Sequence, residues 1–412
     1  MKFAIKYIAA AICVSICTSS FASPLREAVL RNAAIENGFV KPEQTHATVN
    51  LELVKVGKLL FESKLLSLNE DTACASCHLD RFGSADGLPN AIGVGGVGHG
   101  ERRLRSEGAI IPRNTLALWG VGGLEFDRFF WDGKVDKSDQ QISSQFGDSK
   151  PSDDPLVVAV HLPPAELDEM LRDSKENLIF ETESVGSATA LYKILTARIL
   201  SDSRLAQEVA VAYPEVREVT FLHLAKAIAA FIRENFKLQP TKFSKFVFEN
   251  GALTEAELKG GLVFYGKGRC SGCHKGPYFS DMKFHAIPFP QIGFGKNGYG
   301  VDYGRFNTTL NAEEIYKFRT PVLYNVAKTA PYSHSGAVTS LKDAIIYHFD
   351  PLKDYQSERD DSRSRAEFYK RLSVWSNETF KPELLNEDDI ENLITFLGTL
   401  EFEAQMSVLE LE

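Results

Sequence analysis

Cys74-Ala75-Ser76-Cys77-His78 and Cys270-Ser271-Gly272-Cys273-His274 are two copies of the pattern C-x-x-C-H, and they decide the fold of the chain. Two thiols three residues apart lie on one turn of helix, so both can reach the same planar group. The pattern is typical of a covalently attached c-type haem whose iron is bound by the histidine. A zinc site or a redox dithiol is the alternative use of paired cysteines. We predict two covalent haem c groups, on Cys74, Cys77 and His78, and on Cys270, Cys273 and His274.

The composition is that of an ordinary soluble protein, with 412 residues, 44% of them apolar and 25% charged. This length allows two or three domains with hydrophobic cores. The formal charge of −9 argues against nucleic acid or an anionic membrane surface as a partner. It is compatible with a basic electron-donor protein. No later run of 18 apolar residues exists, so we expect no membrane-spanning segment.

The first residues have the pattern of a targeting segment. Two lysines precede an apolar stretch at residues 8–17, and Ser20-Phe21-Ala22 supplies small residues for cleavage before Ser23. We therefore predict a signal peptide at residues 1–22 and export to the bacterial periplasm. Cys17 leaves a lipoprotein open as an alternative. The four cysteines that remain after cleavage are all assigned to haem, so no disulfide is expected.

A similar helical stretch precedes each C-x-x-C-H motif. Gly57-Lys58-Leu59-Leu60-Phe61 precedes the first, and Gly260-Gly261-Leu262-Val263-Phe264 precedes the second. Thr254 and Glu257 form a capping box for the second of these helices. A closing helix is predicted over residues 387–401, where apolar residues recur at helical spacing.

The predicted fold class is mostly α, with two tandem class I cytochrome c-like domains that each hold one covalent haem c. A strong helical pattern over residues 196–236 suggests that the domain boundary falls near it. We assign residues 23–215 to the N-terminal domain and residues 216–412 to the C-terminal domain. The long irregular stretches 83–113 and 279–311 are expected to wrap the haems, because loops of this length are unusual unless functional.

The sequence resembles the bacterial dihaem cytochrome c peroxidase / MauG family over nearly all of the mature chain. The resemblance implies a peroxidatic haem in the N-terminal domain and an electron-transfer haem in the C-terminal domain. It also implies reduction of hydrogen peroxide with electrons from a small c-type cytochrome or cupredoxin. Family members often pair, but nothing in this sequence identifies a homodimer interface. The matching segments are Gly57 to Phe61, Cys74 to His78, Pro112-Arg113-Asn114, Phe130-Trp131-Asp132-Gly133-Lys134, Cys270 to His274, Asp302-Tyr303-Gly304-Arg305-Phe306, Phe318-Arg319-Thr320-Pro321 and Thr329-Ala330-Pro331-Tyr332-Ser333-His334-Ser335-Gly336.

The resemblance assigns Trp131 to the path between the haems, with Lys134 where the family has arginine. The alternative for Trp131 is a half-buried aromatic that only packs at a domain interface. Gln141 and Glu169 match the family's catalytic glutamine and glutamate on the distal side of the first haem. An insertion before Pro163 separates them, so a solvated helix glutamate is the alternative for Glu169.

Two histidines match distal positions of the family. His99 matches the ligand that caps the peroxidatic iron, and the alternative is an exposed loop histidine. His348 falls where the family has methionine or tyrosine above the second haem. Tyr347 is adjacent, but successive helical residues point about 100° apart, so only one of the two can face the iron. A histidine that merely packs in the core is a further alternative.

Asn114, by its side chain, and Thr329 and Pro331, by their carbonyls, match the family's calcium ligands. Oxygen-only ligation suits calcium, and ordinary turn chemistry around Pro331 is the alternative.

Two other functions remain open at this point. One is MauG-like oxidation of a partner protein's aromatic residues, which His99 argues against and the missing methionine argues for. The other is a non-catalytic dihaem electron carrier, which the insertion between Gln141 and Pro163 would permit.

Overall fold

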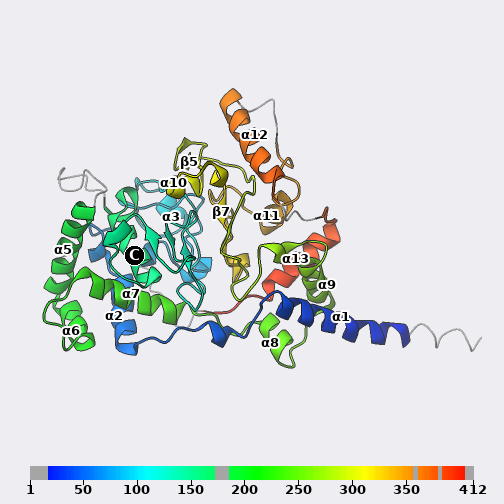
Figure 1. Ribbon diagram of the computed structural model, residues 1–412, viewed down its shortest axis with the longest axis horizontal. Helices are drawn as coiled ribbons and strands as arrows, with labels where there is room; N and C mark the ends of the chain where they lie inside the picture. The colour runs from blue at the N-terminus through cyan, green and yellow to red at the C-terminus, as the bar shows by residue number, and fades with distance from the viewer. Residues whose placement is uncertain (1–16, 172–184, 356–360, 379–382, 404–412) are drawn as a thin grey trace, which may run out of the picture.

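The computed structural model describes residues 17–171, 185–355, 361–378 and 383–403, and its fold is mostly helical (Figure 1). Each strand is only two residues long, so short antiparallel pairs merely pin loops together. The expected signal peptide falls mainly on residues outside the described part. The helices are α1 (Cys17–Glu36), α2 (Leu51–Phe61), α3 (Glu101–Leu104), α4 (Pro155–His161), α5 (Val185–Ser201), α6 (Ser203–Ala212), α7 (Phe221–Asn235), α8 (Lys242–Phe248), α9 (Glu255–Tyr265), α10 (Phe306–Thr309), α11 (Leu341–Tyr347), α12 (Ser362–Ser376) and α13 (Glu387–Gly398). The strands are β1 (Arg128–Phe129), β2 (Val135–Asp136), β3 (Ser143–Ser144), β4 (Phe284–His285), β5 (Phe294–Gly295), β6 (Gly298–Tyr299) and β7 (Phe318–Arg319).

The first half of the chain is built on the crossing of α2 and α7. Gly57 lies at the crossing, where a Cβ atom would come 2.0 Å from the carbonyl oxygen of Ala227 and 2.7 Å from Cβ of Phe231. Only glycine lets the two backbones approach this closely. Asn50 caps the start of α2 by accepting a hydrogen bond from the backbone of Glu52 at 2.8 Å.

The second half repeats this arrangement with α9 and α13. At Gly260 a Cβ atom would come 1.9 Å from the carbonyl oxygen of Asn392 and 2.7 Å from Cβ of Phe396. The predicted capping box forms, with Thr254 N donating to Glu257 at 2.6 Å and Glu257 N donating to Thr254 at 3.3 Å. In each half, a glycine before the motif contacts a carbonyl and a phenylalanine one turn further along the partner helix.

Each half of the molecule includes a helix that lies outside the corresponding half of the sequence. α7 follows the predicted division at residues 215 and 216, yet it packs against α2 of the first half. α1 begins the described chain but packs against α9 of the second half, where Arg26 donates to Glu255 at 2.7 Å. Figure 1 shows α1 beside α9 and α13, far along the chain from it.

The predicted continuous helix over residues 196–236 was wrong in detail. Asp202 interrupts it by capping α6 through the backbone of Arg204 and Leu205. The chain then leaves the helix at Tyr213 and resumes in α7 after Thr220. The apolar periodicity continues through this region, but the cap at Asp202 and the proline at position 214 divide the helix. The closing helix α13 starts at Glu387 as predicted and ends at Gly398.

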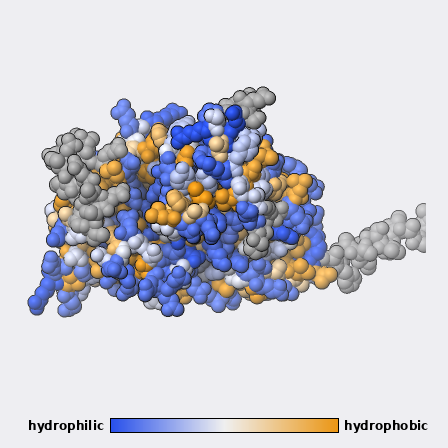
Figure 2. All heavy atoms as spheres, turned by 45° about the horizontal axis from the view of Figure 1, so that its top comes forward, coloured by the Kyte–Doolittle hydropathy of each residue, from blue (hydrophilic) through white to orange (hydrophobic). Residues whose placement is uncertain are grey.

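Most apolar side chains are enclosed between these helices and loops. The face drawn in Figure 2 is largely hydrophilic, with hydrophobic residues in small groups. Among the described residues, no helix is both long enough and apolar enough to cross a bilayer.

Candidate active site

Both C-x-x-C-H motifs fold into the same short helical turn. The turns span Cys74–Ser76 and Cys270–Gly272. Each is closed by the backbone N–H of the histidine, which donates to the carbonyl of the first cysteine at 3.0 Å for His78 and 2.8 Å for His274. The spacing thus brings the two cysteines and the histidine of each motif to one turn.

The ring of each motif histidine is oriented in the same way. His78 Nδ1 lies 2.9 Å from the carbonyl oxygen of Ser84, and His274 Nδ1 lies 3.0 Å from that of Phe279. A donor at Nδ1 leaves Nε2 as the nitrogen with a free lone pair, the usual arrangement for a metal-binding histidine. Burial lowers the pKa of both rings to about 4, so both are neutral at pH 7.

The surroundings of the motif thiols favour their neutral form. None of the four motif cysteines forms a disulfide. Burial raises the pKa of Cys74, Cys77 and Cys270 to about 12, so without a bound group these thiols are protonated at pH 7. Cys273, Asp281 and His285 offer ligand atoms within 4.8 Å of one another. Both ring nitrogens of His285 already face carboxylates, however, at 3.0 Å from Asp281 and 3.3 Å from Glu378.

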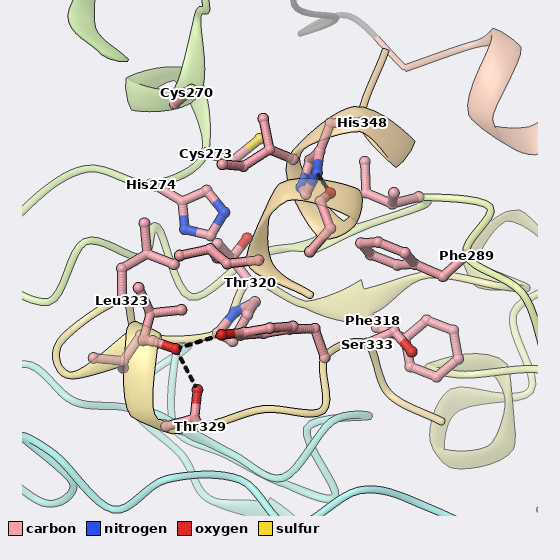
Figure 3. Close-up of a pocket in the computed structure, with 18 of the residues that line it drawn as sticks. Cys270, Cys273, His274, Phe289, Phe318, Thr320, Leu323, Thr329, Ser333 and His348 are labelled. Carbon is pink, nitrogen blue, oxygen red and sulfur yellow. Dashed lines mark hydrogen bonds between the residues drawn. The ribbon is translucent and has the colours of Figure 1, made fainter. Parts of the chain in front are cut away.

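The second motif lines an apolar cavity with His348 on its opposite wall (Figure 3). The ring centres of His274 and His348 lie 6.4 Å apart. His348 Nδ1 lies 2.7 Å from the carbonyl oxygen of Ala344, so its Nε2 is again the remaining nitrogen. Tyr347 does not line this cavity, because its hydroxyl donates to Asp354 at 2.7 Å.

This separation fits a metal between the two rings. Metal–imidazole bonds are about 2 Å long. Two such bonds in line put the imidazole centres about 6 Å apart, which agrees with the 6.4 Å separation. The residues of the second cavity therefore fit an iron centre with two histidine ligands.

The first motif lines another cavity together with Glu169. Glu169 lies on a π-helical turn, Leu167–Leu171, whose backbone is fixed by loops from the first half. Leu68 N donates to Met170 O at 2.8 Å, and Val94 N donates to Asp168 O at 3.2 Å. Gly93 permits this contact, since a Cβ there would come 1.9 Å from Asp168 O. The loop packing aligns Glu169 with the motif despite the insertion.

The pKa of Glu169 is raised to about 7 by burial, with a smaller contribution from Glu166, while Lys134 and Lys296 oppose the shift. Lys134 forms an ion pair with Glu166, and this pair and Lys296 also line the cavity. Motif matching did not single out Glu166 or Lys296. Lys296 reaches the first cavity from the β5–β6 turn of the second half, within the irregular stretch 279–311 that the sequence marked as functional.

Two predicted distal residues do not line the first cavity. Gln141 is exposed, and His99 is half-buried in its glycine-rich loop. Their proposed roles remain predictions. The segments bearing Glu169 and Gln141 are not brought together around the first motif.

Trp131 lines both cavities and forms part of the wall between them. Its indole Nε1 donates to the carbonyl oxygen of Asn114 at 2.9 Å. Its ring meets Phe318 edge-on, with centres 6.5 Å apart. Arg319 lies in the same shared wall, and its backbone N–H donates to Trp131 O at 2.8 Å.

Of the three expected calcium ligands, Asn114 and Pro331 contact each other. Asn114 Nδ2 donates to Pro331 O at 2.6 Å and to Ser333 O at 3.3 Å. Calcium would need the amide oxygen on that side, which a half-turn of the side chain provides. Pro331 O and Asn114 thus fit the expected site only after this rotation, and the calcium assignment remains a prediction.

Comparison with known proteins gives matches over most of the chain. Residues 51–251 match the family model described as di-haem cytochrome c peroxidase. Cytochrome c551 peroxidase from Pseudomonas aeruginosa is 26% identical over 396 residues, covering 92% of this chain and 89% of its own. Methylamine utilization protein MauG from Methylorubrum extorquens is 25% identical over 380 residues, covering 90% and 85%.

The chain is similar to the di-haem cytochrome c peroxidase / MauG family, through the family model over residues 51–251 and through relatives over most of its length. The resemblance inferred from the motifs is thereby confirmed. A solved MauG-like protein associated with microbial copper homeostasis has the same fold, with a TM-score of 0.61, 23% sequence identity, and coverage of 88% of this chain and 92% of that one.

The family model and the peroxidase relatives indicate that the chain is an oxidoreductase. They also support haem as the cofactor of the two motif-lined cavities. The two cavities meet at Trp131, so the site is a pair of centres with a common wall.

Proposed function

We propose that the chain is a periplasmic dihaem cytochrome c peroxidase, which reduces hydrogen peroxide to water with electrons from a small c-type cytochrome or cupredoxin. The observation that carries this proposal is the first cavity, where a neutral motif histidine and a carboxyl group with a pKa near 7 line the same space. A metal ligand and a proton-transfer group in one pocket suit peroxide cleavage.

Each haem is attached through thioether bonds in this proposal, to Cys74 and Cys77 and to Cys270 and Cys273. His78 and His274 are the proximal ligands, and His348 is the second ligand of the C-terminal haem. Each haem-binding unit is a cytochrome c-like domain. Helix packing favours a first unit that closes with α7 rather than at residue 215, and a second that includes α1.

Haem iron supplies the electrons that break the O–O bond when it is bound. Reduction of one peroxide takes two electrons and two protons and yields two waters. Glu169 in its ionised form accepts the proton from the oxygen that approaches the centre and returns it to the departing oxygen, which leaves as water. A carboxyl group whose pKa lies near 7 is suited to both steps, because it gains and loses a proton at similar cost.

The second cavity suits an electron-transfer role. His274 and His348 would both hold the iron of this haem, so this centre would serve electron transfer rather than peroxide binding. Trp131, in the wall between the cavities, is the residue through which electrons pass to the first centre. The acidic chain would attract a basic donor protein.

The test begins with chain produced in a host that matures c-type cytochromes. The intact mass should exceed that of the mature chain by two haems. Peroxide consumption should then require a reduced small c-type cytochrome. Glu169→Gln should lower turnover by about 100-fold or more without changing the mass, while Glu101→Gln on the exposed face of α3 serves as a control. A mass equal to that of the bare chain, or full turnover in Glu169→Gln, would contradict the proposal.

A second candidate is oxidation of aromatic residues on a partner protein, as the likeness to MauG suggests. The observation that favours it is the position of His99 outside the lining of the first cavity, which leaves that side without a histidine ligand. Incubation with peroxide and candidate partner proteins separates the two functions. A covalently altered partner indicates this candidate, whereas steady turnover with a reduced donor indicates the peroxidase.

A further inference from the structure

Arg319 is a buried cation whose observed hydrogen bonds all go to uncharged acceptors. Its side chain is in β7, and the residue is only 4% exposed. Nε donates to Phe130 O at 3.0 Å, and Nη1 donates to Thr320 O and to the sulfur of Met282, both at 3.3 Å. These acceptors orient the guanidinium but do not neutralise it.

No carboxylate of the described residues lies within ion-pair distance of Arg319. Asp127 acts on it only from further away, and Arg128 opposes that attraction; burial lowers the pKa of Arg319 to about 10. Arg113 provides the contrast, because it is buried in the same region and binds Asp132 at 2.6 Å and Asp302 at 2.8 Å. A buried charge without a partner costs several kcal/mol in general. In this region the fold pairs Arg113 with two carboxylates and leaves Arg319 without an anion.

The guanidinium lies where two cofactors would meet. Arg319 is one of the few residues that line both cavities, and its neighbours in the shared wall include Trp131 and Asn114. Its backbone and Nε both bind the segment Phe130–Trp131, so its position is fixed relative to the wall. An anionic group on a cofactor bound in either cavity could therefore reach this side chain.

We propose that Arg319 binds a propionate carboxylate of one of the two haems. The inference rests on the haem binding of the proposed function but not on its peroxidase activity. Haem carries its own anions in its two propionates, and the planar fork of arginine suits a carboxylate. The bond neutralises the buried arginine and fixes the propionate against the segment that carries Trp131. A cation beside the propionate also favours the reduced state of that haem, because reduction adds negative charge.

The test is a redox titration of both haems in Arg319→Gln, without peroxide. Loss of the cation should lower the midpoint potential of the haem whose propionate it binds. We expect at least a tenfold change in the equilibrium constant of reduction, which corresponds to about 59 mV for a one-electron couple. The haem whose midpoint potential changes is the one that carries the bound propionate. Arg319→Lys retains the charge and should restore most of the potential.

Arg128→Gln is the matched control, because Arg128 is half-buried nearby but lines neither cavity. Its partner Asp136 keeps Arg305 at 2.8 Å in that variant. The inference would be overturned if the equilibrium constant of reduction changed less than twofold in Arg319→Gln. It would also be overturned if the change were equally large in Arg128→Gln. A chain that carries no haem contradicts the proposed function instead.

If Arg319→Gln fails to accumulate as a dihaem protein, the Arg319→Lys variant decides. Lysine cannot reproduce a two-pronged bond to a carboxylate. The propionate bending band in the resonance Raman spectrum should therefore shift between the native protein and Arg319→Lys. An unchanged band overturns the inference.

Discussion

At the scale of single residues, two glutamates of the first cavity have opposite protonation behaviour. Burial opposes ionisation of Glu166, but Lys134 outweighs it and lowers the pKa of Glu166. Glu169 lacks such a partner, and burial raises its pKa to about 7. Carboxyl groups whose pKa values are driven apart in one site commonly divide the acid and base roles between them. Glu169 is therefore the group that can exchange a proton near neutral pH.

Glu169→Gln should lower kcat/KM for peroxide by about 100-fold or more, the usual contribution of a positioned acid–base group. In the native protein kcat/KM should rise with pH and level off above about pH 7, because the ionised form accepts the first proton. The rise should be absent from the residual activity of the variant. A pH profile that is flat between pH 5 and 9 in the native protein would contradict the assignment.

His348→Met should raise the reduction potential of the C-terminal haem. Methionine opposite histidine favours ferrous iron, and axial ligands tune haem potentials over about 0.8 V. Redox titration of the variant measures the change. Tyr347→Phe is the matched control, since Tyr347 is adjacent but binds Asp354 away from the cavity. Equal potentials in His348→Met and the native protein would exclude His348 as an iron ligand.

The parts of the site that the sequence predicted are those defined by short spacing. Cys74 to His78 and Cys270 to His274 form a turn by themselves, so no long-range information was needed. Gln141 and His99 were assigned by matching positions across an insertion and a lengthened loop, and neither lines the first cavity. Lys296 and Arg319 reach the site from the second half of the chain, and only tertiary packing could reveal that.

At the scale of elements, the helix–helix crossings explain why the fold is recognisable at low identity. The sequence predicted α9 with its cap and the start of α13. It did not predict which helix closes the first half, because the apolar pattern of residues 196–236 continues through α5, α6 and α7. Ala227 and Phe231 on α7 hold the same positions as Asn392 and Phe396 on α13. Gly57 on α2, which corresponds to Gly260 on α9, is the sequence feature that could have identified α7 as the partner helix.

Gly57→Ala and Gly260→Ala should each destabilise the protein by about 3 kcal/mol or more, since overpacking at a close contact forces the backbones apart. The new methyl group would lie 2.0 Å and 1.9 Å, respectively, from a carbonyl oxygen of the partner helix. Denaturant unfolding measures the loss. Gly398→Ala in α13 is the control, because nothing lies within 4 Å of its added methyl group. It should be neutral or stabilise the protein by up to about 1 kcal/mol. Equal stability of all three variants would show that the crossings tolerate a methyl group.

At the scale of the whole molecule, buried charges join the two halves. Arg113 of the first half binds Asp132 at 2.6 Å and Asp302 of the second half through two bonds at 2.8 Å and 2.9 Å. Burial opposes ionisation of both carboxyls, but Arg113 outweighs it and lowers their pKa values. The stability from this cluster is thus present above the ordinary aspartate pKa and is lost as the pH falls through the lowered values.

Arg113→Met should cost about 3–5 kcal/mol at pH 7, because it leaves two carboxylates buried without their cation. The loss should be smaller at pH 4, where the two carboxyls of the variant take up protons instead of remaining charged. Urea unfolding at both pH values measures the difference. Arg105→Met, which removes an exposed partner of Glu101, should have little effect. A larger loss at pH 4 than at pH 7 would contradict the assigned role of the cluster.

The wall shared by the two cavities lies on the proposed path between the two haems. Trp131 presents the largest aromatic ring in that wall, and its bond to Asn114 O holds the ring in place. Trp131→Phe should slow electron transfer from the C-terminal to the N-terminal haem and leave the haem content unchanged. Rapid-mixing absorbance spectroscopy after reduction of the C-terminal haem measures the rate, and intact mass measures the haem content. Trp119→Phe is the matched control, because Trp119 is buried and bound to Gly83 O at 2.7 Å but lines neither cavity. If both variants transfer electrons at the native rate, the path between the centres does not pass through Trp131.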